Sequence, residues 1–291
     1  MTTLSRFEIH QPASVREASQ MLSEFGEEAG FYAGGTELLL AMRHKALNYR
    51  HLVDLKVIPG LDTIAANGDR IDIGAACTHR AVERSGHVLE KLPVLAELES
   101  HVANVRVRAT GTIGGNLCFA EPHSDPATLL LALEARLTAE GATGSRELGM
   151  EDLIDGAYSN NLQPGEILTR VSVPVAKPNH RSAYVKFQIH ERPSLGLALW
   201  LETPDNAQTF AAARVAIGCV GPFPARVREA EAMLTGSRSE LEKRLDDPAD
   251  AIADSADLLD DHEGSAAYKR HLIHVFLRRA FLRAVGDSTA R

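Results

Sequence analysis

Two glycine-containing segments hold the residues of this sequence that are best suited to chemistry. They are residues 33–37, AGGTE, and residues 111–116, GTIGGN. Glycine permits positive φ and adds no Cβ, so the backbone N–H groups of such a turn can converge on an anion. A diphosphate requires donors of this kind and a close approach of the backbone. A pair of glycines also suits an ordinary turn, but two such turns, with side-chain donors at Thr36 and Asn116, favour a dinucleotide site.

Asp125 follows the second segment and has two alternative roles. Its carboxylate can accept hydrogen bonds from ribose hydroxyls, or it can cap a helix that we predict over 124–133. His123 and Ser124 precede it and give the stretch the composition of a hydrolytic triad. The members of a triad meet in space and seldom lie next to one another in the chain. We therefore do not expect a hydrolase.

Other catalytic and metal-binding motifs are missing from the sequence. It contains no GxxxxGK[ST], HExxH, GxSxG or GxGxxG. His271 and His274 lie one helical turn apart without a third ligand, so we expect them to be structural. Cys77, Cys118 and Cys219 are far apart and number fewer than the four ligands that an iron–sulfur cluster normally takes. Redox chemistry would need a bound organic cofactor, and the thiols otherwise serve as small buried hydrophobes.

The composition excludes several further classes of protein. Lys and Arg number 31 and Asp and Glu 39, which gives a formal net charge of −8. This balance argues against broad binding to nucleic acid or anionic lipid, because such binding requires basic patches. No apolar run approaches the ~20 residues of a membrane span, and the N-terminal residues lack the apolar core of a signal peptide. We expect a cytoplasmic protein with no nucleic-acid partner and no membrane span.

The elements that must position the first glycine segment alternate between strands and helices. Apolar periodicity predicts a β-α-β-α-β unit with the glycine pair at a strand-to-helix turn. Ser14 and Glu17 have the spacing of a capping box, and Thr36 is expected to cap the second helix. The predicted strands cover 7–10, 30–33, 51–55, 61–65 and 70–74, and the predicted helices cover 14–25 and 36–44.

The remainder of the chain is predicted to contain helices, then strands, then helices again. Residues 78–102 are helical with an interruption at Pro93, whereas 103–125 are expected to form a long structured loop of the kind that carries function. A boundary is expected near 174–178, and the acidic stretch 240–263 should form solvated helix faces. Further strands are predicted over 136–139, 167–173, 183–188, 195–201 and 213–220, and further helices over 124–133, 226–234 and 268–285.

The ordered set of motifs resembles a known family. A strand followed by AGGTEL at 33–38, then GTIGGNL at 111–117, then Asp125 and Pro126 before an apolar helix are similar to the FAD-binding medium subunit of the molybdenum hydroxylases. That family includes xanthine dehydrogenase and aerobic carbon monoxide dehydrogenase. The resemblance extends over nearly the whole chain, because YVKF at 184–187 and the Arg-rich C-terminal helix also resemble it.

The resemblance implies an α+β fold. It implies a two-lobed, vanillyl-alcohol-oxidase-like (PCMH-type) FAD-binding domain over 1–177, with lobes at about 1–56 and 57–177. A small C-terminal domain of antiparallel sheet plus helices would follow over 178–291.

The resemblance also implies the residues that contact FAD. Asp125 would bind a ribose-type hydroxyl, and Leu168 and Lys186 match positions that contact the cofactor, although Lys186 is otherwise an ordinary exposed lysine on a strand. The two glycine segments would wrap the diphosphate and its neighbouring groups with Tyr32, Ala33, Gly34, Gly35, Thr36, Glu37, Leu38, Thr112, Ile113, Gly114, Gly115 and Asn116. No catalytic side chain and no metal ligand are expected.

Two departures from the family pattern bear on the substrate and the cofactors. Glu37 stands where many relatives have Asp, and Thr36 with Glu37 replaces the His-Ser that carbon monoxide dehydrogenases proper tend to have. This difference argues against carbon monoxide as substrate. The additional iron–sulfur insertion of one branch of the family is absent from the sequence.

The function implied is that of an electron-transfer subunit in a heteromeric molybdenum hydroxylase. The expected partners are a molybdopterin-binding large subunit and a [2Fe–2S] small subunit, with a dimer of heterotrimers as one arrangement. Electrons would pass from the clusters to FAD and then to NAD, a quinone or another acceptor. Two alternatives stay open, namely a free-standing FAD-dependent oxidoreductase on the same fold, such as an enolpyruvyl-sugar reductase-like enzyme, and a flavin-free scaffold.

Overall fold

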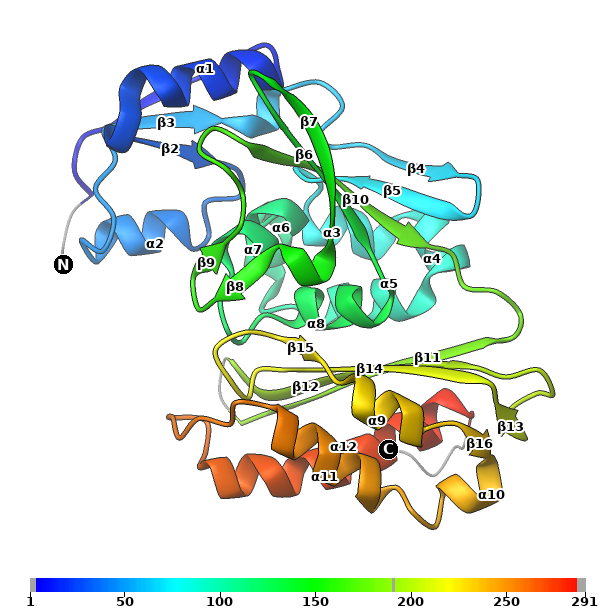
Figure 1. Ribbon diagram of the computed structural model, residues 1–291. Coiled ribbons are helices and arrows are strands. Elements are labelled where there is room, and N and C mark those ends of the chain that lie inside the picture. The colour runs from blue at the N-terminus through cyan, green and yellow to red at the C-terminus, as the bar shows by residue number, and fades with distance from the viewer. Residues whose placement is uncertain (1–3, 190–191, 287–291) are drawn as a thin grey trace.

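Three hydrophobic clusters hold the chain together, and each is built mainly around one of three sheets. The computed structural model describes residues 4–189 and 192–286. Figure 1 shows the N-terminal sheet at the top left, a larger sheet with its helices in the centre, and a third sheet with the C-terminal helices below. The combination of helices with mainly antiparallel sheets confirms the predicted α+β class. Within the described residues, no helix combines the length and the apolarity needed to cross a bilayer.

The N-terminal sheet is parallel and has the strand order β1-β3-β2, which confirms the predicted β-α-β-α-β unit. The Ser14 hydroxyl accepts a hydrogen bond from the Glu17 N–H, as a capping box requires. The Glu17 carboxylate accepts from the N–H of Ala13 at 2.7 Å rather than from that of Ser14, so the box is formed in part. The elements are β1 (Glu8–His10), α1 (Val15–Phe25), η1 (Gly26–Glu28), β2 (Ala29–Tyr32), α2 (Leu38–Arg43), β3 (His51–Asp54) and η2 (Leu55–Val57).

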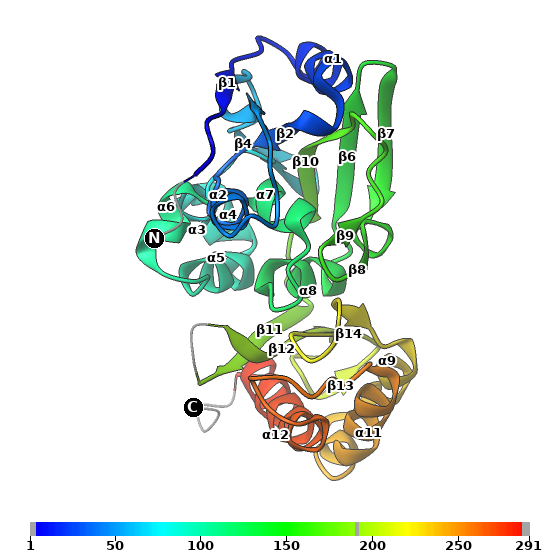
Figure 2. The same ribbon diagram turned by 90° about the vertical axis from the view of Figure 1, so that its left-hand side faces the viewer.

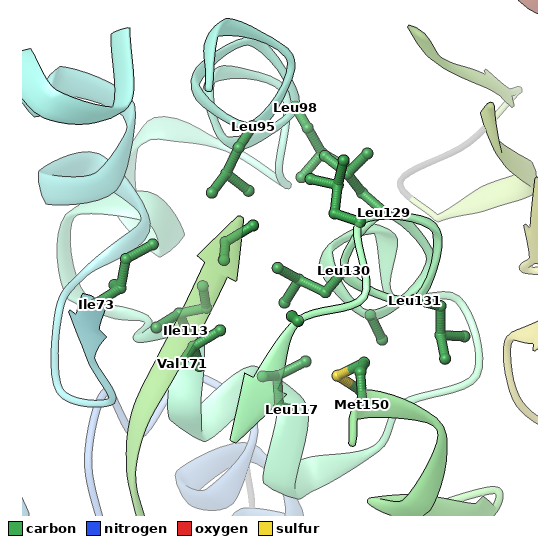
Figure 3. Packing of buried hydrophobic residues seen from close by; sticks show 14 of the residues in the cluster. Ile73, Leu95, Leu98, Ile113, Leu117, Leu129, Leu130, Leu131, Met150 and Val171 are labelled. Carbon is green, nitrogen blue, oxygen red and sulfur yellow. The ribbon is translucent and has the colours of Figure 1, made fainter. Parts of the chain in front are cut away.

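The central sheet is antiparallel and has the order β4-β5-β10-β6-β7, with a small β8-β9 hairpin beside it. The strands are β4 (Ile64–Asn67), β5 (Arg70–Gly74), β6 (Arg136–Gly141), β7 (Gly144–Gly149), β8 (Ile154–Gly156), β9 (Ser159–Asn160) and β10 (Ile167–Pro174), and η3 (Met150–Asp152) follows β7. The helices are α3 (His79–Arg84), α4 (Gly86–Lys91), α5 (Pro93–Ser100), α6 (Val105–Thr110), α7 (Ile113–Phe119) and α8 (Asp125–Ala132). Figure 3 shows how apolar side chains from strands and helices, among them Ile73, Leu95, Leu130 and Val171, meet in this core.

The prediction of a long loop over 103–125 is wrong, because the structure places α6 and α7 there. Asn104 caps α6 by accepting hydrogen bonds from the N–H groups of Arg106 and Val107. Thr112 caps α7 in the same way by accepting from Gly115. Helices of six and seven residues span too few turns to reveal an apolar period in the sequence.

The C-terminal sheet is antiparallel, has the order β11-β12-β14-β15, and is covered on both faces. Tyr184, Ala198 and Trp200 belong to the core of the central sheet, whereas their neighbours Val185 and Leu199 belong to the core formed with the C-terminal helices. Figure 2 shows α8 above this sheet and α12 and α11 below it. The elements are β11 (His180–Gln188), β12 (Pro193–Glu202), β13 (Thr209–Phe210), β14 (Ala212–Gly218), β15 (Ala225–Arg226), α9 (Arg228–Met233), β16 (Gly236–Ser237), α10 (Arg238–Leu241), α11 (Asp246–Ser255) and α12 (Ala266–Ala284).

Candidate functional site

A cavity of about 530 Å³ opens where the three parts of the fold meet. Its lining includes residues after β2, residues of α3 and α7, Leu168 of β10, and Lys186 and Arg192 from the C-terminal sheet region. All of the predicted FAD-contacting residues except Tyr32 and Ile113 line this cavity. A volume of this size, with several polar groups among apolar ones, is typical of a small-molecule site.

Tyr32 and Ile113 support the cavity from behind rather than lining it. A Cβ added to Gly35 would lie 2.5 Å from the Tyr32 ring, so the ring packs directly against that glycine. The Lys56 ammonium lies 3.6 Å from the centre of the same ring and donates a hydrogen bond to the Ala33 carbonyl at 2.8 Å. Ile113 is fully buried in the central core (Figure 3).

The first glycine turn, residues 33–37, leaves its backbone donors free. Gly35 has φ +71°, a conformation in which a non-glycine residue is strained. Thr36 does not cap the next helix, which corrects the prediction: Glu37 precedes α2 and makes no capping bond. Among the described residues, none accepts a hydrogen bond from the N–H groups of Gly34, Gly35, Thr36 or Glu37. Free N–H groups on residues that line the cavity suit an anion such as a diphosphate.

The second glycine turn, residues 111–116, uses the N–H groups of residues 113–116 within the protein. The N–H of Ile113 donates to the Cys77 carbonyl at 3.0 Å, and that of Gly114 donates to the Ala75 carbonyl at 2.9 Å. The N–H of Gly115 donates to the Thr112 hydroxyl at 3.1 Å, and that of Asn116 donates to the Thr112 carbonyl at 2.9 Å. The expectation that these N–H groups converge on an anion is therefore wrong for this turn, because capping and strand contacts already occupy them.

Close packing, rather than positive φ, explains the glycines of the second turn. Neither Gly114 nor Gly115 has a positive φ. A Cβ at Gly114 would lie 2.5 Å from the Cβ of Ala75 and 2.7 Å from its carbonyl oxygen. The two turns also touch, because a Cβ at Gly34 would lie 2.6 Å from the Cα of Gly111. The second turn thus forms the backing against which the first turn is placed.

Asp125 joins the helix α8 to the C-terminal sheet. Its Oδ1 accepts a hydrogen bond from the Tyr184 hydroxyl at 2.6 Å, and its Oδ2 accepts from the Lys186 ammonium at 2.9 Å. Lys186 also donates to the His101 carbonyl at 2.7 Å, so it is held rather than freely exposed. Asp125 caps no helix here, since Ser124 precedes α8 and makes no capping bond.

Tyr184 is a member of the site that sequence reasoning missed. It is 8% exposed, and burial together with the Asp125 carboxylate raises the pKa of the phenol well above its ordinary value. The hydroxyl therefore stays protonated and serves as a donor to Asp125. The YVKF motif already contained this residue, but its partner lies 59 residues away in the chain.

Charged side chains gather at the cavity between residue 121 and the C-terminal sheet region. Arg192 forms an ion pair with Glu121, and His123 lies with Nδ1 3.1 Å from the same carboxylate. The Nε2 atom of His123 lies 3.6 Å from the Oδ2 atom of Asp261. The hydrogen bond to Glu121 raises the pKa of His123, and burial raises the pKa of Glu37. The three residues 123–125 thus have separate partners, because the Ser124 hydroxyl donates to Asn116 at 2.6 Å.

Cys77, Cys118 and His274 agree with structural roles. Burial raises the pKa of Cys77 to about 11 and that of Cys118 to about 12, so both thiols stay protonated at neutral pH. His274 lies within 3.4 Å of Asp246 and Asp250 on α11. Protonated thiols are poor nucleophiles and poor metal ligands.

The residues in the cavity fit a flavin adenine dinucleotide. Free N–H groups at the first turn suit the diphosphate, Asp125 offers oxygens to a hydroxyl, and Leu168 gives an apolar surface. The glycines allow the turns to pack against each other and against their neighbours more closely than a Cβ would permit. This donor set matches the chemistry of a dinucleotide better than that of a metal ion.

Comparison with known proteins gives two family matches that together span most of the chain. The family described as FAD binding domain in molybdopterin dehydrogenase matches residues 5–176. The family described as CO dehydrogenase flavoprotein C-terminal domain matches residues 190–284.

Relatives and a solved structure agree with these matches. The carbon monoxide dehydrogenase medium chain of Afipia carboxidovorans is 32% identical over 281 residues, covering 96% of each chain. The nicotine 6-hydroxylase medium subunit of Paenarthrobacter nicotinovorans is 31% identical, covering 94% of this chain and 95% of that one. A chain of Cu,Mo-CO dehydrogenase superposes with a TM-score of 0.92 at 30% identity, covering 98% of this chain and 100% of that one. This likeness confirms the predicted PCMH-type FAD-binding fold.

Proposed function

This chain belongs to the FAD-binding flavoprotein family of the molybdopterin dehydrogenases, and we propose that it serves as the electron-transfer subunit of such an enzyme. In this role it accepts electrons from [2Fe–2S] clusters of a partner subunit and passes them to NAD, a quinone or another acceptor. The observation that supports the proposal most directly is the match to a carbon monoxide dehydrogenase medium chain over 96% of both chains.

The two glycine turns have different roles in the proposed site. The N–H groups of residues 34–37 bind the diphosphate, because they are free and belong to residues that line the cavity. Residues 112–116 hold the first turn in place and contribute contacts along the wall. Asp125 accepts from a ribose-type hydroxyl in addition to its donors on β11, and Leu168 and Lys186 contact the cofactor.

No side chain of this chain needs to act as a general acid or base in this function. Bound FAD supplies redox chemistry that takes up and releases one or two electrons. The protein binds it, orients it by hydrogen bonds at the diphosphate and at a hydroxyl, and excludes water with apolar residues such as Leu168, which is 3% exposed.

We propose the same division of the chain as the sequence suggests. An FAD-binding domain covers 1–177, with lobes at about 1–56 and 57–177, and a C-terminal domain covers 178–291. The change from the central core to the C-terminal core supports this division. In the proposed site the cavity takes residues from both lobes and from the C-terminal domain.

The proposed partners are a molybdopterin-binding large subunit and a [2Fe–2S] small subunit, with a dimer of heterotrimers as one arrangement. The medium chain and medium subunit to which this chain is similar are named as parts of larger enzymes, which supports these partners. We place the assembly in the cytoplasm as part of the same proposal.

An anaerobic experiment tests the proposed function. The isolated chain, loaded with FAD, is mixed with candidate purines, aldehydes and aromatic heterocycles while the flavin absorption band is followed. We expect no bleaching by these substrates, and rapid bleaching by a reduced [2Fe–2S] partner subunit. Dithionite serves as the control that the bound flavin can be reduced. Rapid bleaching by an organic substrate alone would instead support the free-standing flavoenzyme.

A further inference from the structure

A buried histidine–carboxylate pair lies beside the cavity and has no part in the proposed function so far. His79, the first residue of α3, is 2% exposed, and Glu99 on α5 is 0% exposed. The His79 Nδ1 lies 2.6 Å from the Glu99 Oε2. The other oxygen of Glu99, Oε1, is buried and has no hydrogen-bond partner among the described residues. The contact with Glu99 occupies Nδ1 of the His79 ring, and it leaves the second ring nitrogen, Nε2, for another partner.

The ring of His79 lies at the seam between the two glycine turns. Its backbone N–H donates to the Gly111 carbonyl at 3.0 Å. A Cβ added to Gly111 would lie 3.3 Å from the His79 Cδ2 and 3.4 Å from the Thr36 hydroxyl. The Cδ2 edge of the His79 ring and the Thr36 hydroxyl therefore both border the same position beside Gly111, and Thr36 belongs to the turn with free N–H groups. His79 and Thr36 both line the cavity.

The other cations that line the cavity are already paired with carboxylates. Lys186 lies 2.9 Å from Asp125, and Arg192 pairs with Glu121. The lining carboxylates of Glu37, Glu121, Asp125 and Glu166 would oppose an anion. A diphosphate in this cavity therefore depends on N–H donors rather than on Lys or Arg, and charge-assisted N–H donors are the stronger ones.

We propose that His79 is a diphosphate-binding residue whose Nε2–H donates to a phosphate oxygen of the dinucleotide. Glu99 is a positioning residue whose hydrogen bond with Nδ1 fixes the orientation of the ring. The pair would thus add one hydrogen-bond donor, the Nε2–H of His79, beside the free N–H groups of the first turn. This inference rests on the proposed FAD site.

Three variants of the full chain test the inference. In His79→Asn the side-chain amide replaces Nδ1 and leaves no donor at the position of Nε2, whereas in His79→Gln the amide reaches the Nε2 position. We expect His79→Asn to weaken FAD binding at least 10-fold and to shift the ³¹P resonances of the bound diphosphate. His79→Gln should restore part of the affinity, and Glu99→Gln should shift the same ³¹P resonances. FAD affinity is measured by titration of the apoprotein.

Glu231→Gln is the matched control, because Glu231 is also a buried carboxylate, paired with Arg226 and outside the cavity lining. It should lower the melting temperature without shifting the ³¹P resonances. If His79→Asn binds FAD with wild-type affinity and unchanged ³¹P resonances, the inference is overturned while the FAD site stands. A wild-type chain that binds no FAD would overturn the proposed function as well.

If His79→Asn does not fold, the wild-type chain labelled with ¹⁵N-histidine decides the question. Addition of FAD to the apoprotein should move an Nε2–H resonance of a histidine that is protected from solvent. Histidine resonances that stay unchanged on saturation with FAD would overturn the inference.

Discussion

The two glycine turns of the cavity lie back to back, and they differ in what their N–H groups do. In residues 34–37 these groups have no partner among the described residues, whereas in residues 113–116 each has an acceptor inside the protein. Gly35 is needed for its φ of +71°, whereas Gly114 is needed because Ala75 leaves no room for a Cβ. Similar residue types thus leave free donors in one turn and serve packing in the other. A Gly-Gly motif therefore indicates that another group lies close to the backbone, but it does not say whether that group is a ligand or part of the protein.

The largest effect expected from this comparison is on stability, at Gly114. In Gly114→Ala the new Cβ would lie within 3.0 Å of three atoms of Ala75, and overpacking of this kind costs roughly 1–3 kcal/mol. We expect the free energy of unfolding of the apoprotein, measured with urea, to fall by more than the free energy of FAD binding does. Gly86→Ala is the control, because nothing lies within 4 Å of its Cβ position. A stable Gly114→Ala protein that fails to bind FAD would contradict a packing role.

The next largest effect is on cofactor affinity, at Gly35. Alanine at positive φ costs roughly 1–2 kcal/mol, and relief of that strain would redirect the free N–H groups of the turn. We expect Gly35→Ala to weaken FAD binding by about 10- to 100-fold. Gly68→Ala has a comparable φ of +60° in open space away from the cavity. It should lose only the stability that the positive φ costs, because its Cβ meets no Tyr32 ring, and it should keep its affinity for FAD. Equal affinity of the two variants would remove the distinction between the turns.

A smaller effect is expected at Thr112, whose hydroxyl caps α7. Thr112→Val removes the acceptor of the Gly115 N–H, and loss of such a cap costs about 1 kcal/mol. The melting temperature should fall while FAD affinity stays within about a factor of 3, or ~0.7 kcal/mol. Ser14→Ala, at the cap of α1, gives the matched loss elsewhere. Weaker FAD binding without a change in melting temperature would assign the hydroxyl to the cofactor.

The smallest effect concerns pH and Glu37. Burial raises the pKa of Glu37 above 4.5 in the folded protein, so its contribution to stability is complete below pH 4.5 and is lost as the pH rises through the raised pKa. Glu37→Gln lacks this loss, so it should be more stable than the wild type at neutral pH and similar to it in acid. Its affinity for FAD should rise by about fivefold or less, because a carboxylate leaves the neighbourhood of the diphosphate. Thermal unfolding curves between pH 4 and pH 8 that run parallel for both proteins would contradict this assignment.

Much of the N-terminal unit could be predicted from the sequence, because its strands and helices carry local signals. The apolar spacing of α1 and its capping Ser14 lie within the element itself. The strand β7 gave no such signal, since four of its six residues are exposed. The helices α6 and α7 gave none either, because each is short and is defined by its cap.

The residues of the site could be predicted from the sequence, but the contacts that each of them makes could not. The predicted residues gather at one cavity, because motif order in the sequence reflects a shared fold. The Gly114 N–H is not free because it donates to the Ala75 carbonyl, and Asp125 holds the C-terminal sheet because it accepts from Tyr184 and Lys186. These partners come from other elements, so periodicity and spacing within a segment carry no information about them.

The position of Asp125 means that cofactor content would report on the contact between α8 and the C-terminal sheet. All eight residues of α8 are buried, and the helix contacts β12 and β14. If the chain were cut between β10 and β11, the Asp125 carboxylate would lose both of its donors, and α8 would expose its apolar side to water. A preparation whose C-terminal sheet has separated should therefore be colourless, and the yellow colour of bound flavin would report an undamaged junction before any assay of activity.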